Sequence, residues 1–382
     1  MKWIADPGRL AEVVRTAGRS DVVAFDTEAD SLHSYFEKVC LIQLSTADDD
    51  YLIDPLAVDP APLGEILADS GIRKIFHGAD YDLRILNRDF GFVTRNLVDT
   101  MICAQLLGES NMGLAALLLQ NFGIELDKSH QRADWSKRPL SEDMKDYAAK
   151  DTRHLVQLAG LMQNRLTDLG RWDWALEEFT RLEDVRWTAP DDNGERFRRL
   201  KGAGRLDRRR LGILSLLHEW RDGHARKRDV PPFKVIGNDA LVALAEKRPA
   251  DPRELARVHG VAGYHQTRYG DEILAVIERG NQLPADQLPE RRVGNPRLRD
   301  RRIDRLVDRM KSVRDQVAAD LGIDASVLAP KHLLLAVATM APATVESLWE
   351  IPAARRWQIN ALGARLLHIV RETDSDDAEH TY

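Results

Sequence analysis

The stretch Val22-Val23-Ala24-Phe25-Asp26-Thr27-Glu28 places two carboxylates at the end of an apolar run. The run is short and partly β-branched, which predicts a buried strand. Because side chains alternate between the two faces of a strand, we expect Asp26 and Glu28 on the same face. Such a pair could chelate a cation, although a strand that merely ends in a polar loop would read the same way.

Short runs of the same kind surround this strand and predict a mixed sheet. Three of them follow one another too closely for crossover helices, so we expect an antiparallel meander of residues 21–25, 39–45 and 51–54. Two further runs, 74–77 and 96–101, alternate with helical patterns at 61–69 and 80–89. We therefore expect an α/β domain, a mixed sheet with flanking helices, over residues 1–187.

Two more acidic segments follow. In His77-Gly78-Ala79-Asp80-Tyr81-Asp82 a strand gives way to a helix, a customary place for functional side chains. Asp82 is our candidate there, with Asp80 as a competitor, although Asp80 would also serve as an N-cap and Asp82 as an ordinary first-turn acid. Tyr147 and Asp151 are four residues apart in a helical segment predicted from Ser141, its N-cap, to about residue 169, so both lie on one helix face.

The composition is that of a globular protein of two or three domains, with 382 residues, 43% hydrophobic and 30% charged. No apolar run approaches the ~20 residues of a membrane span, and the N-terminus lacks a signal-peptide layout, so we expect a cytoplasmic protein without a membrane partner. Cys40 and Cys103 form neither a disulfide framework nor a zinc motif. The absence of GxxxxGK[ST] and HExxH argues against a phosphate-loop nucleotidase and a zinc peptidase.

Charge divides the chain into two halves of opposite sign. Residues 1–185 carry 20 Lys and Arg against 32 Asp and Glu, whereas the remainder carries 35 against 29. Bound cations would reconcile the acidic half with a polyanionic substrate. Residues 196–234 hold 13 basic and 4 acidic residues, a density suited to phosphate contacts, or simply to a solvated basic face.

The second half is organised as a repeat. A Pro-, Gly- and Asp-containing stretch at 188–205 predicts a linker. Beyond it, apolar positions recur after 92 or 93 residues, for example Leu241 and Leu333, or Ile277 and Val370. This spacing predicts two copies of one small all-α domain, at 206–285 and 299–372, followed by an acidic tail at 373–382.

Taken together, Asp26, Glu28, Asp82 and Asp151, with Tyr147 four residues before the last acid, resemble the tyrosine-containing branch of the DEDD exonucleases. The segment 127–141 looks like the stretch before the third motif in ribonuclease D, and the helical repeats resemble HRDC domains. This resemblance covers nearly the whole chain. It implies a ribonuclease-H-like α/β domain followed by two HRDC-type domains, and a 3′→5′ exoribonuclease that releases 5′-mononucleotides.

The resemblance also implies a site and a substrate. Two divalent cations, Mg²⁺ or Mn²⁺, would be held by Asp26, Glu28, Asp82 and Asp151, and Tyr147 would orient the attacking water. The substrates would be precursors of transfer RNA and other small stable RNAs with 3′ extensions, and the protein would be a monomer. Candidate substrate contacts are Gln43, His77, Lys128, Gln131 and Trp135, although core packing would equally explain Trp135.

Two other functions stay open. The same carboxylates would serve a 3′→5′ DNA exonuclease, and only the resemblance of the C-terminal repeats favours RNA. A non-catalytic nucleic-acid-binding adaptor would be expected to have lost at least one of the four candidate metal-binding carboxylates, whereas all four are present.

Overall fold

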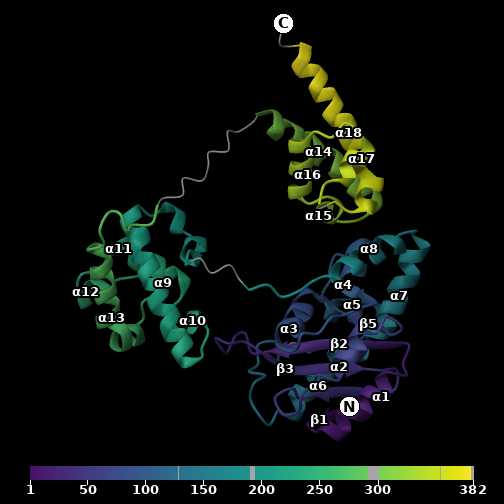
Figure 1. The fold of residues 1–382 in the computed structure, drawn as a ribbon, viewed down its shortest axis with the longest axis horizontal. Coiled ribbons are helices and arrows are strands. Elements are labelled where there is room, and N and C mark those ends of the chain that lie inside the picture. The colour runs from purple at the N-terminus through teal and green to yellow at the C-terminus, as the bar shows by residue number, and fades with distance from the viewer. Residues whose placement is uncertain (128, 190–193, 291–300, 353, 380–382) are drawn as a thin grey trace. The chain divides into compact units, whose positions relative to one another are not determined.

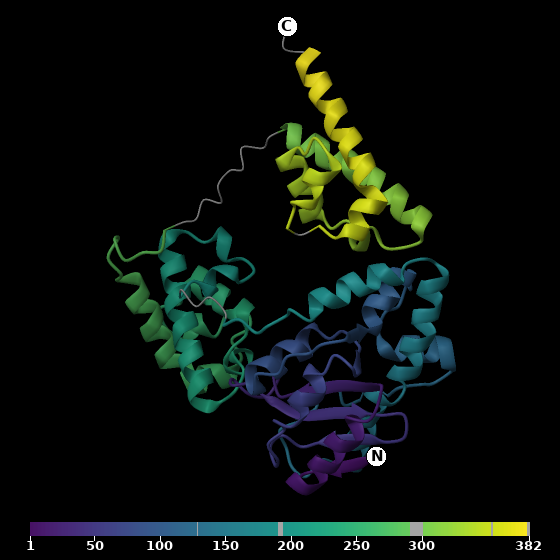
Figure 2. The same ribbon diagram turned by 45° about the vertical axis from the view of Figure 1, so that its right-hand side comes forward.

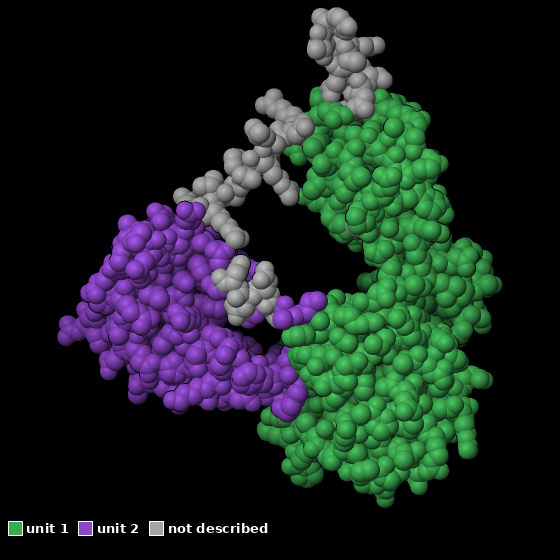
Figure 3. All heavy atoms as spheres, in the orientation of Figure 1, with its two compact units in different colours: residues 1–28, 39–187, 297–382 green, residues 29–38, 188–296 purple. Residues whose placement is uncertain are grey.

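The computed structural model describes residues 1–127, 129–189, 194–290, 301–352 and 354–379. The chain divides into two compact units (Figure 3). Unit 1 comprises residues 1–28, 39–187 and 297–382, and unit 2 comprises residues 29–38 and 188–296. The first helical domain and a ten-residue segment from within the α/β domain thus form one body.

Unit 1 contains a six-stranded sheet in the order β1-β4-β3-β2-β5-β6. Its strands are β1 Lys2–Ile4, β2 Val22–Ala29, β3 Val39–Ser45, β4 Asp50–Ile53, β5 Arg73–Phe76 and β6 Leu97–Asp99. β3 and β4 are antiparallel, whereas β1 with β4, β2 with β5, and β5 with β6 are parallel. The predicted mixed sheet is confirmed. β1 was not predicted, since three residues carry too little pattern.

Eight helices of the described chain surround the sheet (Figure 1). They are α1 Pro7–Ala17, α2 Leu63–Ala68, α3 Asp80–Phe90, α4 Thr100–Leu107, α5 Leu114–Phe122, α6 Glu142–Arg153, α7 Leu155–Asp168 and α8 Trp172–Leu182. The Ser141 side chain caps α6 by accepting a hydrogen bond from the Met144 amide, as predicted. The single helix predicted from 141 to 169 is wrong, because His154, at φ −106° and ψ 1°, separates α6 from α7.

The core beneath α6 is built to bring that helix close to the sheet. Ala148 and Ala149 are buried on α6 and pack with Leu41 of β3 and Leu52 of β4. Alanine side chains allow a close approach of helix and sheet. The helix positions of Tyr147 and Asp151 are thereby fixed relative to the strands.

The two helical domains correspond element for element, which confirms the predicted repeat. In the first, two short 3₁₀ turns, Arg196–Arg199 and Ala203–Arg205, precede α9 Arg208–Arg228, α10 Pro232–Val235, α11 Asn238–Lys247, α12 Pro252–Leu255 and α13 Gly263–Asn281. In the second, the matching helices are α14 Arg301–Leu321, α15 Ala325–Leu328, α16 Lys331–Met340, α17 Val345–Trp349 and α18 Arg356–Glu379. α18 continues to Glu379, through most of the segment 373–382 that we expect to be an acidic tail. Residues 380–382 lie outside the described residues, as do 190–193 of the predicted linker.

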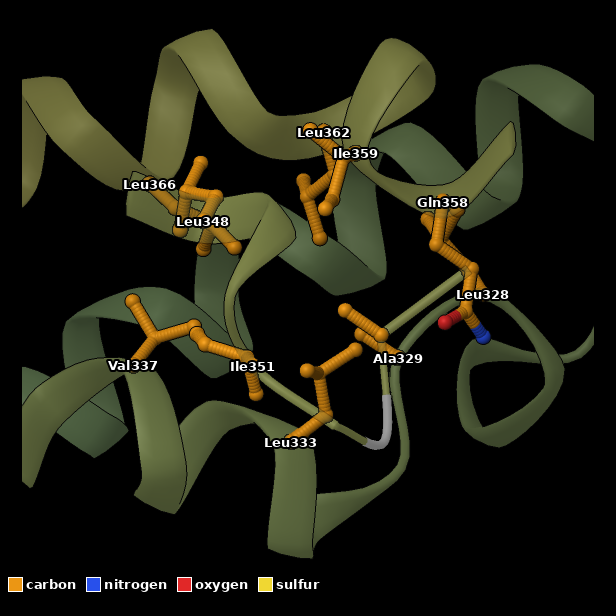
Figure 4. Close-up of a pocket in the computed structure, with 11 residues that line it drawn as sticks. Leu328, Ala329, Leu333, Val337, Leu348, Ile351, Gln358, Ile359, Leu362 and Leu366 are labelled. Carbon is orange, nitrogen blue, oxygen red and sulfur yellow. The ribbon is translucent and has the colours of Figure 1, made fainter. Parts of the chain in front are cut away.

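A small apolar cavity lies at the centre of the second helical domain (Figure 4). Leu333, Val337, Leu348 and Leu366 line it from α16, α17 and α18. Its volume is about 10 Å³, so we interpret this apolar void as a packing feature and not as a substrate site.

The second helical domain packs on α8 within unit 1, and α8 lies between it and the sheet (Figures 1 and 2). Trp357 stacks on Trp174 at a centroid distance of 4.8 Å, and its indole nitrogen donates to Glu178 at 2.9 Å. Gly108 approaches Gly322 so closely that a Cβ would lie 1.7 Å from the Gly322 carbonyl oxygen. The Arg355–Trp357 region is thus used for docking on α8.

Within the part of the chain that the structure describes, no helix combines the length and apolar character needed to cross a bilayer.

Candidate active site

β2 presents the first two carboxylates. Phe25 and Thr27 are buried, whereas Asp26 and Glu28 between and beyond them are only partly buried. This alternation agrees with the predicted common face of Asp26 and Glu28. Phe25 stacks on Phe76 of β5 at 5.9 Å, which anchors the strand next to its parallel neighbour.

The structure distinguishes the two candidates in the second segment. Asp82, in the first turn of α3, is 7% exposed and accepts a hydrogen bond from the Thr27 hydroxyl. The Asp80 side chain is 57% exposed and pairs with Arg84 at 2.8 Å. Asp80 is also not the N-cap, a position taken by Ala79. Asp82 is therefore the residue that faces β2.

α6 carries Tyr147 and Asp151 on one side, as their spacing predicts. The adjacent Thr152 is buried and shares a 2.7 Å hydrogen bond with Ser45 at the end of β3. The Tyr147 ring lies 5.8 Å from His130 and 6.0 Å from Trp135. These contacts hold the phenol and the carboxylate against the sheet.

The four acids influence one another electrostatically. Burial raises the pKa of Asp26 well above its usual value, and Asp82, Asp151 and Glu28 raise it further. Burial, with Asp151 and Asp82, raises the pKa of Glu28 to about 9. Residues from β2, α3 and α6, more than 120 positions apart in sequence, therefore share one electrostatic environment.

The other three titratable groups follow the same pattern. Burial raises the pKa of Asp82 to about 7, against the opposing hydrogen bond from Thr27. Burial likewise raises the pKa of Asp151 to about 7. The pKa of Tyr147 rises well above the phenol value through burial and the nearby charges of Asp151, Glu28 and Asp26. Tyr147 is consequently a neutral hydrogen-bond donor.

Such a cluster suits bound cations. Among the described residues, no Lys or Arg pairs with Asp26, Glu28 or Asp151, so their charge is uncompensated by the protein. Four oxygen donors without a cationic partner fit Mg²⁺ or Mn²⁺ better than Zn²⁺. In the described ranges no group of three or more His, Cys, Asp or Glu side chains stands close enough together to hold a metal ion as it is.

A cavity of about 230 Å³ opens beside Tyr147 and Asp151. It is lined by α6 and the segment before it, with Leu126, Asp127, Ser129, His130, Asp143, Asp146 and Lys150 completing the wall. The phenol and the third-motif carboxylate thus border open space that a substrate could enter.

Two of the predicted substrate contacts are buried. Trp135 is 1% exposed and packs behind Tyr147 with Leu140 and Ala148, so the prediction that it contacts substrate is wrong. Gln43 is 0% exposed, and neither atom of its amide group has a hydrogen-bond partner in the described structure. It lies within the fold and not on a substrate-facing surface.

His77, Gln131 and Lys128 remain candidates. His77 is half-buried, with Nδ1 2.9 Å from the Thr100 hydroxyl. Gln131 is exposed on a turn, and Lys128 lies outside the described residues.

Much of the basic cluster at 196–234 is used inside the fold. Arg208 and Arg209 donate to backbone carbonyls at 280–289, and Arg221 is buried, donating to Ile236 and Asn238. Arg199, Lys201 and Arg205 are exposed and have no partner among the described residues. These three are available to a phosphate backbone, whereas Arg208, Arg209 and Arg221 are used within the domain.

Thr27 and Thr152 are the site residues that sequence reasoning missed. Each adjoins a recognised acid and forms a hydrogen bond to a distant segment, Thr27 to α3 and Thr152 to β3. The only available signal was a hydroxyl residue inside each motif, and its partner could not be read from spacing.

Comparisons with known proteins agree with this geometry. Residues 1–167 match a family model described as 3′-5′ exonuclease, and residues 210–277 and 304–370 each match the HRDC domain model. A ribonuclease D from Gluconacetobacter diazotrophicus is 35% identical over 291 residues, covering 75% of this chain and 73% of that protein. A ribonuclease D from Pseudomonas paraeruginosa is 29% identical over 96% of this chain and 97% of that protein.

Solved structures extend the similarity to the whole fold. The crystal structure of Escherichia coli RNase D, an exoribonuclease involved in structured RNA processing, has a TM-score of 0.71 at 26% identity, covering 97% of this chain and 98% of that one. A protein from Bifidobacterium adolescentis has a TM-score of 0.80 at 22% identity, over 97% and 99% of the two chains, and shows the fold alone.

Proposed function

The chain belongs to the ribonuclease D family and is a hydrolytic 3′→5′ exoribonuclease, and from this premise we propose that it trims RNA 3′ ends by two-cation hydrolysis at Asp26, Glu28, Asp82 and Asp151. The observation that carries the proposal is the convergence of β2 and α3, joined by the bond from Thr27 to Asp82, with α6, whose Asp151 lies near enough to raise the pKa values of Asp26 and Glu28. Four acids without a basic partner form a site for cations, and hydrolysis of a phosphodiester requires that chemistry.

Each carboxylate has a place in this proposal. Asp26, Glu28 and Asp151 would hold one cation, and Asp26 with Asp82 would hold the second. When bound, the cations would lower the pKa of a water molecule and neutralise the charge that develops on the phosphate and the leaving 3′ oxygen. The hydrogen bond from the Thr27 hydroxyl orients the Asp82 carboxylate.

Tyr147 orients the attacking water. Its raised pKa keeps the phenol protonated at neutral pH, so it donates a hydrogen bond and does not act as a free base. Its ring is fixed by Trp135 behind it and His130 beside it. The water would enter from the cavity that Tyr147 and Asp151 border.

The proposed substrates are precursors of transfer RNA and other small stable RNAs with 3′ extensions, handled by a monomer in the cytoplasm. The exposed Arg199, Lys201 and Arg205 support a phosphate-binding role for the first helical domain. For the second, the docking of Trp357 on α8 supports a structural role at that face.

Matched oligonucleotides test the substrate class. The purified protein is given an RNA and a DNA of the same sequence and 3′ end, with Mg²⁺ or Mn²⁺, and the products are resolved at single-nucleotide length. We expect stepwise shortening of the RNA and release of 5′-mononucleotides. Equal or faster shortening of the DNA would favour a DNA exonuclease instead.

A further inference from the structure

Residues 29–38 connect β2 to β3, yet they belong to the unit formed by residues 188–296 (Figure 3). Adjacent strands can be joined by a short turn of two to five residues. This connection is longer, and its outer part is packed into the first helical domain. Because it directly follows Glu28, its anchoring bears on the catalytic strand.

The tip of the connection is held by Tyr35. Its hydroxyl donates to the Asp222 carboxylate at 2.9 Å, and the Arg226 guanidinium lies over its ring at 5.5 Å. The ring also packs against the apolar core of the first helical domain. A side chain that combines ring packing with a bond to a carboxylate has one favoured position.

Asp229 holds the backbone of the same tip. One of its carboxylate oxygens accepts hydrogen bonds from the amides of Tyr35, at 2.9 Å, and Phe36, at 3.0 Å. Asp229 ends α9 in the left-handed conformation, with φ 46°, where Asp and Asn are the best-tolerated residues with a side chain. The helix end and the loop tip are thus fixed together.

Hydrogen bonds also hold the base of the connection. The buried carboxylate of Asp30 accepts from the Ser34 hydroxyl at 2.7 Å, from the Lys38 amide at 2.8 Å and from the Lys38 ammonium at 2.6 Å. These bonds tie the two ends of the loop, Asp30 and Lys38, together. Asp30 is only two residues beyond Glu28, so the loop that the first helical domain holds begins directly after the strand that carries Asp26 and Glu28.

We propose that the 29–38 connection is a latch, in which Tyr35, seated on Asp222 and Asp229 of the first helical domain, positions the β2 end that carries Asp26 and Glu28. Tyr35 is a positioning residue, since it acts through the strand and touches neither substrate nor cation. The first helical domain therefore contributes to turnover as well as to binding, and the inference rests on the proposed function of the β2 carboxylates.

The test compares Tyr35→Ala and Asp229→Ala with the matched variants Tyr35→Phe and Asp229→Asn in the full chain. Asp229→Asn keeps an acceptor oxygen and the tolerance for positive φ, so it should behave as wild type. Tyr35→Phe keeps the ring and loses the bond to Asp222, so it should be intermediate. Circular dichroism and the melting temperature identify any variant that fails to fold.

The readouts are amide hydrogen exchange of residues 29–38, kcat and KM on a short single-stranded oligoribonucleotide, and the Mg²⁺ concentration at half-maximal rate. For the two alanine variants we expect faster exchange, a kcat lower by about 5- to 50-fold and a higher Mg²⁺ midpoint, with KM changed by no more than about 2-fold. Displacement of β2, which carries Asp26 and Glu28, would lower kcat and the affinity for cations. Loss of an RNA contact would instead raise KM.

Faster exchange with unchanged kcat and Mg²⁺ midpoint would reduce the connection to a tether and overturn the proposal. Unchanged amide exchange of residues 29–38 would show that these contacts do not hold the loop, which would also overturn the proposal. Failure of the proposed function is separate, since it would appear as a wild-type protein that trims no RNA. In that case calorimetric binding of Mn²⁺ to wild type and Tyr35→Ala still reports on the latch, and equal affinities would overturn it.

Discussion

The Thr27 hydroxyl donates a hydrogen bond to the Asp82 carboxylate, so the residue between two candidate ligands on β2 also fixes a third on α3. Both partners are buried, and the bond opposes the rise in the pKa of Asp82 that burial causes. The candidate site is therefore cross-linked by a neutral side chain as well as by the cations it would bind.

Thr27→Val removes this bond while keeping the shape of the side chain. The pKa of Asp82 should rise further, and its carboxylate should lose orientation. We expect kcat to fall by about 10- to 100-fold and the Mg²⁺ midpoint to rise, as is usual when a group supporting a ligand is lost. Thr27→Ser, which keeps the hydroxyl, is the control; equal rates for all three proteins would remove Thr27 from the site.

Asp26→Asn and Asp151→Asn each remove a charge from the acidic cluster without changing its volume. We expect activity to be abolished while the melting temperature is retained or raised, because like-charge repulsion falls. Asp80→Asn is the control, since that side chain is exposed and pairs with Arg84. A near-normal turnover in either site variant refutes the assignment.

Tyr147→Phe tests the phenolic donor alone. The ring contacts with Trp135 and His130 would persist, so the fold should not change. Loss of one transition-state hydrogen bond should lower kcat by roughly 10- to 1000-fold with little effect on KM. An unchanged kcat would leave Tyr147 as a packing residue.

The metal-free protein should lose stability as pH rises. The folded-state pKa values of Asp82 and Asp151, about 7, and of Glu28, about 9, exceed the usual carboxyl values of ~4 in an unfolded chain. The stabilisation from these neutral carboxyls is complete below about pH 4 and is lost as pH rises through 7 to 9.

Melting temperatures in chelator between pH 5 and 9 measure this effect. We expect a fall of several degrees, at about 2–4 °C per kcal/mol for a domain of this size. Mg²⁺ should restore stability most at high pH, where the carboxylates are ionised, and Asp151→Asn should show a shallower fall. A melting temperature independent of both pH and Mg²⁺ would contradict the cation site.

The exposed basic groups of the first helical domain predict a salt effect. Replacing Arg199, Lys201 and Arg205 together by Ala should weaken RNA binding and lower the slope of log affinity against log salt by up to about 2 to 3. Arg208→Ala, whose guanidinium donates to carbonyls at 285–289, should act on stability instead. An unchanged slope in the triple variant would locate the RNA contacts elsewhere.

The candidate residues could be proposed from sequence because their signals are local. Two acids at alternate strand positions, and a phenol four residues before an acid, need only the geometry of one strand or helix. The sequence alone left Asp80 and Asp82 as alternatives, and the contact that favours Asp82 comes from Thr27, 55 residues away.

What sequence reasoning could not supply was non-local. Trp135 is buried because it packs between α6 and β3. No pattern in the segment 127–141 predicts that packing. Basic density at 196–234 did not reveal that Arg208, Arg209 and Arg221 cap carbonyls within the domain. The assignment of residues 29–38 to the helical unit likewise depends on partners almost 200 residues away.

The most direct test of the central claim is incubation of the purified protein with a 3′-extended RNA, with Mg²⁺ or Mn²⁺ and with chelator. The cluster of Asp26, Glu28, Asp82 and Asp151 predicts stepwise release of 5′-mononucleotides that stops when the cation is removed. An RNA end left intact with either metal, or trimmed equally well in chelator, would contradict it.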